Sequence, residues 1–334
     1  MTTSVSSAAT AEQSRFNASD LLQRFGTLGI FIVLVIVATV WSDSFLSSRN
    51  VVNVLRQVAA GAGIMSVGML FVILTAGIDL SVGSIEALGS VLIAYFIAVS
   101  GFGATSSVGL VILSGAACGL VTGAFVAYIR LAPFVMSLAM MAIARGLSLI
   151  ISSGQPIPLG PGGDIIATFG AGFLPLGAFS LPWPVVLMFA VFAIAGVVLN
   201  FTRFGRIVKA IGSNEEAVRL SGIPVQRYVV AVYVISGALA AVAGIISSSR
   251  TTVGSSQVGV GMELNVIAAV VIGGASLMGG RGGVFNTFLG AMIMGIIGNI
   301  MNLAGVPGYH QQVYTGLIII VAMLLQFGST VLRR

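Results

Sequence analysis

The chain has little charge and almost none of the side chains used for catalysis or metal binding. Among its 334 residues, 15 are Lys or Arg and 9 are Asp or Glu. Cys118, His310 and Lys209 are each the single residue of their type. One cysteine inside an apolar segment excludes disulfides and cysteine-based metal sites within the chain. One histidine excludes an HExxH zinc motif, no serine stands in GxSxG, and no GxxxxGK[ST] phosphate loop is present. The sequence therefore predicts no enzyme, no cofactor, no metal site and no ATP site of its own.

What fills the chain instead is apolar sequence. Hydrophobic residues make up 57% of it, charged residues 7%, and the mean hydropathy is +1.10. A soluble domain of this length needs far more charge to wet its surface. The segments 87–129, 165–202 and 282–332 contain no charged residue, and only helices or closed barrels can satisfy the backbone in lipid. Because these runs are continuous and do not alternate, we expect an all-α polytopic membrane protein. Its net charge of +6 fits arginines that flank spans better than a nucleic-acid partner.

Length and turn residues divide the apolar sequence into about ten transmembrane helices. Residues 1–24, rich in Ser, Ala and Thr, are predicted to form a tail, and residues 25–330 the transmembrane domain. The tail lacks the pattern of a cleaved signal peptide. The expected spans are 25–42, 51–75, 80–99, 107–129, 133–152, 183–200, 228–247, 262–278, 284–302 and 311–328.

Basic residues near the span ends set the expected orientation, because cytoplasmic loops carry the excess of Lys and Arg. With the N-terminus inside, only Arg49 and Arg250 fall on the outer side. Both termini are therefore expected in the cytoplasm, in the bacterial plasma (inner) membrane. The inner side collects Arg15, Arg24, Arg130, Arg203, Arg206, Lys209, Arg219, Arg227, Arg281, Arg333 and Arg334.

One cytoplasmic connection, residues 201–227, is unusually polar. Asn214 is placed to cap a short helix over 214–221, with Glu215 and Glu216 in the first turn, where the helix dipole favours acids. Gly222 and Pro224 are expected to end it. An ordinary solvated connection is the alternative. The excess of basic residues in cytoplasmic loops does not explain the two neighbouring acids. We therefore expect a docking helix for a soluble partner.

A second polar segment, LTAGIDLSVGS at 74–84, joins the second and third predicted spans. Asp79 or Ser81 can accept from free amides at the start of the next helix. Capping alone accounts for Asp79. The functional alternative makes Asp79, Ser81 and Ser84 part of an inner gate or partner contact.

Ionisable and amide residues inside spans are further candidates for a gate or a solute pathway. Glu86 lies in the third span, where a carboxylate is a functional candidate by default. It can instead pair with Arg145 or Arg56, or snorkel to the inner surface. Arg145 is expected to bind a carboxylate or carbonyl within the bundle. Asn299 and Asn302, with Asn286, Gln311 and Gln312 nearby, are either pathway groups or interhelical hydrogen-bond partners.

Five stretches of the chain resemble permease subunits of ribose-type ATP-binding-cassette importers over about residues 26–330. Two of these, LTAGIDLSVGS at 74–84 and IGSNEEAVRLSGI at 211–223, are highly specific in combination. The others are ARGL at 144–147, GQPIP at 154–158 and AAVVIGGASLMGGRGG at 268–283.

This resemblance implies the partners and the role of the polar connection. It implies a second permease copy, a cytosolic ATP-binding cassette subunit, and a periplasmic or extracellular solute-binding protein. It also implies a monosaccharide such as ribose as the solute. Two departures stand out: Glu86 replaces a usual apolar residue, and Glu216 a usual alanine. The residues implied to form the ATPase coupling helix are Gly212, Asn214, Glu215, Glu216, Ala217, Arg219, Leu220, Ser221 and Gly222.

Two alternatives stay open at this point. An ion-coupled secondary transporter would use paired carboxylates and broken helices near mid-membrane, for which Glu86 and Glu263 are the available residues. Within the importers, a branched-chain amino acid or purine nucleoside permease is the nearest rival. The sequence does not name the sugar, because selectivity rests largely with the delivering protein.

Overall fold

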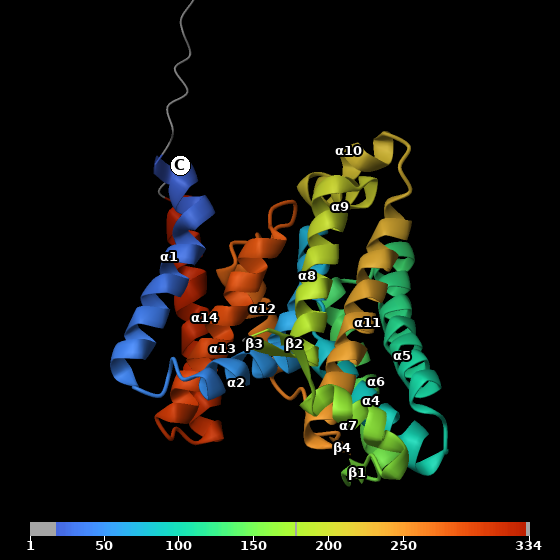
Figure 1. Ribbon diagram of the computed structural model, residues 1–334. Helices are drawn as coiled ribbons and strands as arrows, with labels where there is room; N and C mark the ends of the chain where they lie inside the picture. The colour runs from blue at the N-terminus through green and yellow to red at the C-terminus, as the bar shows by residue number, and fades with distance from the viewer. Residues whose placement is uncertain (1–17, 178, 332–334) are drawn as a thin grey trace, which may run out of the picture.

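The structure is a computed structural model that describes residues 18–177 and 179–331. Most of the predicted tail 1–24 lies outside the described residues, and α1 begins at Ala18. Helices follow one another along nearly the whole chain (Figure 1). The membrane-length or apolar elements are α1 (Ala18–Trp41), α2 (Ser48–Val58), η1 (Ala59–Gly63), α3 (Ile64–Leu74), α4 (Val82–Ala94), η2 (Tyr95–Val99), α5 (Ala104–Ala124), η3 (Phe125–Ile129), α6 (Pro133–Ser152), α8 (Trp183–Phe201), α11 (Val225–Thr251), α12 (Met262–Ile272), α13 (Val284–Leu303) and α14 (Gly308–Val331).

Seven helices in the described residues are long and apolar enough to cross a membrane. An all-helical polytopic membrane fold is therefore confirmed, whereas the count of about ten stays a prediction. Each of the seven coincides with one expected span, because long apolar runs with few charged residues fix helix positions well. They are Ser48–Leu74, Val82–Val99, Ala104–Ile129, Pro133–Ser152, Trp183–Phe201, Val225–Thr251 and Val284–Leu303.

One expected span, 262–278, is a shorter helix. α12 has 11 residues, which at about 1.5 Å per residue covers roughly half of a hydrocarbon core. The helix starts after Gly261 and ends before Gly274, and both glycines have positive φ. Glycine adopts this backbone without strain, so the chain turns at both ends of α12. Hydrophobicity alone did not reveal these breaks.

The remaining elements lie in the connections between spans. Two antiparallel pairs join β1 (Ile157–Pro158) to β4 (Val253–Gly254) and β2 (Phe173–Leu176) to β3 (Phe179–Pro182). Ile157 pairs with Gly254, and Phe173 pairs with Pro182. In Figure 1 the β1–β4 pair lies at the end of the molecule opposite α10. The short helices are η4 (Pro161–Gly163), α7 (Asp164–Ala171), α9 (Arg203–Ser213) and α10 (Glu215–Leu220).

The core forms around α3, α4 and α11. Every residue of α3 and of α4 is buried, and α11 packs against both of them and against α5. Glycines allow the close approach of α5 and α11: a Cβ on Gly237 would overlap the carbonyl oxygen of Gly115, and one on Gly119 would overlap that of Tyr233. Small residues thus let these two helices pack backbone to backbone, as is common in membrane proteins.

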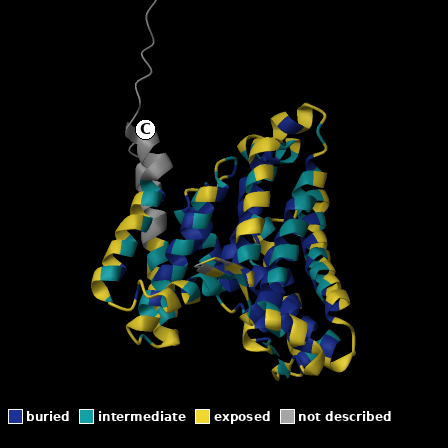
Figure 2. Cartoon of the chain, viewed as in Figure 1, coloured by how far each residue is buried: buried dark blue, intermediate teal, exposed yellow. Residues whose placement is uncertain are grey.

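Outer helices keep apolar side chains on the surface, as lipid contact requires. Exposed apolar residues include Val33 on α1, Leu113 on α5, Ile150 on α6 and Ile194 on α8. Figure 2 shows exposed residues along these outer helices and buried residues inside the bundle. The solvent for these faces is therefore the hydrocarbon of the bilayer.

Candidate functional site

The polar connection 201–227 folds into two short helices. Thr202 caps α9, and its hydroxyl accepts a hydrogen bond from the Gly205 amide at 3.3 Å. Asn214 caps α10, and its Oδ1 accepts from the Ala217 amide at 2.9 Å. These are the helix and the cap expected from the sequence. Gly222, with φ of +76°, lies directly after the Ser221 cap and ends the helix as predicted.

α10 is anchored by one face and presents the other. Val218 is buried and packs with Ile211 of α9 and Val225 of α11. Glu215, Glu216 and Arg219 are exposed, and Leu220 is 79% exposed. Because a helix this short is not stable alone in water, the cap and the Val218 contact hold it in place. α10 is therefore a short, firmly held surface helix with an acidic first turn.

An ion pair joins Glu216 to Arg219 across one turn of α10. The hydrogen bond from Arg219 holds the pKa of the Glu216 carboxyl below its ordinary value, and the same bond raises the pKa of Arg219. Both side chains are solvent-exposed, so this pair contributes little to stability. It orients the two charges on the outer face of the helix.

Gly212 connects α10 to the rest of the bundle. A Cβ on Gly212 would overlap the carbonyl oxygen of Leu74 and the amide nitrogen of Gly280. The Gly280 amide itself donates to the Leu74 carbonyl at 3.0 Å. The end of α9, the end of α3 and the turn 273–283 therefore meet backbone to backbone. Three motifs that are far apart in the sequence form one junction, which we call the glycine junction (Gly212, Leu74 and Gly280).

Asp79 lies just after this junction and is fully buried. Its Oδ1 accepts from the amide and the hydroxyl of Ser81. Its Oδ2 accepts from the Ser236 hydroxyl of α11 at 2.7 Å. Asp79 thus stabilises the turn before α4 and ties that turn to α11. Its bond to the Ser81 amide lies one residue before the helix, so the predicted cap on the first amides of α4 is not formed. Ser81 makes no capping bond with its own side chain, and Ser84 is buried near it.

Arg145 binds carbonyl groups, one of the two kinds of partner expected for it. Its guanidinium donates to the carbonyls of Ser256 and Val258, and more weakly to that of Gly83 at 3.4 Å. It fastens the segment between α11 and α12 onto α6 and α4. Arg145 makes no ion pair with Glu86 in the described part of the chain. Glu86 is buried, and its Oε2 has no hydrogen-bond partner there.

The two asparagines expected near the pathway form hydrogen bonds with other side-chain amides. Asn299 and Asn50 exchange two hydrogen bonds of 2.9 and 3.0 Å between α13 and α2. Asn302 accepts from Gln311 at 2.8 Å. Interhelical bonding accounts for both, and neither lines the cavity described next.

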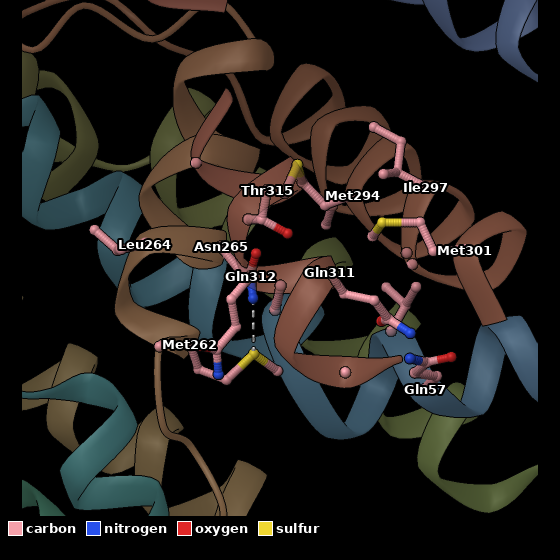
Figure 3. A pocket seen from close by; sticks show the side chains of 18 of the residues that line it. Gln57, Met262, Leu264, Asn265, Met294, Ile297, Met301, Gln311, Gln312 and Thr315 are labelled. Atoms are coloured by element: carbon pink, nitrogen blue, oxygen red, sulfur yellow. Dashed lines mark hydrogen bonds between the residues drawn. The ribbon is translucent and has the colours of Figure 1, made fainter. Parts of the chain in front are cut away.

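Sequence reasoning missed one cavity, between α2, α12, α13 and α14 (Figure 3). Its volume is about 370 Å³, and Gln57, Asn265 and Thr315 line it together with the already noted Gln311 and Gln312. The only sign of this cavity in the sequence was the presence of single amide side chains within apolar spans. No group of three metal-binding side chains occurs in the residues that the structure describes.

The sequence has close relatives among import permeases. A family model described as "Branched-chain amino acid transport system / permease component" matches residues 50–323. The chain is 40% identical to the ribose import permease protein RbsC of Escherichia coli K12, over 93% of this chain and 95% of that protein. It is 42% identical to RbsC of Bacillus subtilis 168, over 94% and 96%.

A third relative carries a different sugar in its name. The L-arabinose ABC transporter permease protein AraH of Azospirillum brasilense is 35% identical, over 93% of this chain and 90% of that protein. No solved structure matches the chain. Since these relatives are permeases, the chain is a transport subunit and not an enzyme, and it is a multi-pass protein of the plasma (inner) membrane. The chain therefore belongs to the family of ATP-binding-cassette import permeases whose model is described as the permease component of branched-chain amino acid transport.

Proposed function

We propose that the chain is the permease of a monosaccharide importer and moves a sugar such as ribose into the cytoplasm by alternating access. The named relatives that support this carry ribose or L-arabinose in their names. A secondary transporter driven by an ion gradient is not favoured by these relatives. The energy comes from ATP hydrolysis on a separate cassette subunit.

The exposed, capped helix α10 carries this proposal. Its acidic first turn offers charge to a cytosolic partner. Gly212, near the end of the preceding helix α9, is in backbone contact with Leu74 and Gly280. A push on a rigid helix moves the packed elements behind it as a body. Closure of the cassettes against Glu215 and Arg219 would therefore reach α3 and the turn 273–283 directly.

Buried polar residues behind the junction have a proposed role in the gate. Asp79 joins the start of α4 to α11, and Arg145 joins α6 to the segment before α12. With Ser81, Ser84 and Glu86 they lie where these elements must shift against one another. Asn299 and Asn302 position α13 through hydrogen bonds to other side-chain amides.

The arrangement of the chain supports the proposed topology. The start of α1, the end of α14 and α10 lie on the same side of the molecule (Figure 1), in line with two cytoplasmic termini and ten spans. The proposed partners are a cassette subunit, a periplasmic or extracellular solute-binding protein and a second permease copy in the bilayer. Nucleic acid has no proposed role.

Charge reversal at the tip of α10 tests the proposal. Glu215→Arg should abolish ATP-driven sugar uptake and cassette stimulation while the permease still inserts in the membrane. The matched control is Asp43→Arg, a reversal at an exposed acid between α1 and α2, which should leave both activities intact. Full uptake by Glu215→Arg would remove α10 as the coupling helix.

A further inference from the structure

The cavity of about 370 Å³ has the size of a small-solute site. Ligand pockets in proteins span roughly 300 to 1,000 Å³, so this volume at the lower end suits a solute of a few carbon atoms. Figure 3 shows side chains of α12, α13 and α14, with Gln57 of α2, around the space. The cavity lies apart from the glycine junction and from the Asp79 network.

Its lining is polar without being charged. The polar side chains are Gln57, Asn265, Gln311, Gln312 and Thr315, and among the residues that the structure describes no Asp, Glu, Lys or Arg lines the space. The two nearest charges in the sequence are directed elsewhere. Glu263 approaches Gly83 of α4, and Arg56 donates to the Ala171 carbonyl at 2.8 Å and lies over the Phe173 ring.

Several of these polar groups have hydrogen-bonding capacity to spare. Gln57, Gln312 and Thr315 make no side-chain hydrogen bond within the described residues, whereas the amide nitrogen of Gln311 donates to Asn302 and Val306. An amide both donates and accepts, as a hydroxyl group does. Such groups match a solute whose hydroxyls each need a donor and an acceptor.

Apolar contacts come from flexible side chains. Met262, Met294 and Met301 line the cavity and can pack against the C–H faces of differently shaped rings. A zwitterionic amino acid would instead bring two charges into a site without an opposite charge, which is costly. The lining thus favours a neutral polyol over the amino acid in the family's description.

Both walls of the cavity contain a break in a helix. Gly61 in η1 departs from helical geometry, with φ of −111° and ψ of −121°. The side chain of Met262, at the start of α12, lies against it. Broken helices of this kind border solute sites in other transporters. A change at either break would reshape the cavity, which suits a site that must release its solute.

We propose that this cavity is a binding site for an uncharged polyhydroxylated solute of monosaccharide size, recognised through Gln57, Asn265 and Gln312. The proposal rests on the transport function above, because it gives the solute of that function a binding site within the permease. Binding should be weak, since a pathway site must also let the solute leave.

Cysteine protection on the purified full-length permease tests the site without any cassette. In a Cys118→Ser background, Leu264→Cys, Ile297→Cys and the conservative Thr315→Cys, at lining positions other than the three recognising amides, are labelled with a small neutral maleimide. Millimolar D-ribose or L-arabinose should slow labelling severalfold at these positions, and L-leucine should not. Labelling of the control Ser221→Cys, on the exposed end of α10, should be unaffected.

Two results would overturn the proposal: protection by L-leucine equal to that by the sugars, or protection by neither sugar at the positions whose variants purify as folded protein. Adding Glu215→Arg separates this proposal from the function above. If sugar protection persists while ATP-driven uptake is lost, both proposals stand. If protection persists and uptake is normal, the coupling proposal fails and the site stands.

Discussion

The backbones of Gly212 and Leu74 touch in this structure, so closely that a side chain at position 212 has no room. A Cβ there would overlap the Leu74 carbonyl oxygen, which already accepts from Gly280 at 3.0 Å. Since both neighbours are backbone atoms, neither can rotate away. This contact makes the cytoplasmic helix pair α9–α10 continuous with the bundle.

Gly212→Ala should therefore separate the junction. Overpacking of this kind costs about 1–3 kcal/mol, and we expect a lower apparent Tm in detergent together with reduced uptake. Gly196→Ala is the matched control, because nothing lies within 4 Å of a Cβ at that position of α8. A Gly212→Ala protein with wild-type Tm and uptake would contradict the contact.

Loss of the cap should weaken α10 without altering its charges. Asn214→Ala removes the acceptor for the Ala217 amide, and such caps contribute about 0.5–2 kcal/mol. We expect cassette stimulation to fall. Asn214→Asp, which keeps a capping oxygen, should retain most of it. Equal loss in both variants would mean that the cap is not what matters at position 214.

Coupling through α10 should be insensitive to pH near neutrality. The bond from Arg219 lowers the pKa of Glu216. A group whose folded-state pKa is depressed stabilises the fold above its unfolded pKa, and that contribution is lost as pH falls through the folded pKa. The pair should therefore weaken only below the ordinary glutamate value of 4.5. Cassette binding measured by co-purification across the neutral range should stay flat, and a transition there would contradict the assignment.

Asp79 and Ser236 should be energetically coupled. Asp79→Ala leaves the buried Ser81 and Ser236 donors without their acceptor, and each such loss costs about 1–3 kcal/mol. Ser236→Ala should cost less and should have little further effect once Asp79 is replaced. Thermal unfolding of the two single variants and the double variant gives the coupling energy. Strict additivity would show that the bond carries no stability.

The sequence predicted most spans because charge-free runs and turn residues mark them directly, as for 183–200, which is Trp183–Phe201. It also predicted the capped helix after Asn214, where local chemistry decides the structure. It did not predict that α12 ends at Ile272, since the sequence stays apolar beyond Gly273. The glycine junction and the cavity join residues more than a hundred positions apart, so composition and spacing could not reveal Gln57 or Asn265 as neighbours.

The most direct test of the coupling account is a distance between α10 and the turn 273–283. Leu220→Cys and Met278→Cys, both at highly exposed positions, are spin-labelled in a Cys118→Ser chain diluted with unlabelled chain in the assembled importer. If the junction transmits motion as one rigid body, the distance distribution stays the same with and without a nonhydrolysable ATP analogue. A distribution that shifts on nucleotide binding would mean that α10 moves independently of the bundle, contrary to this account.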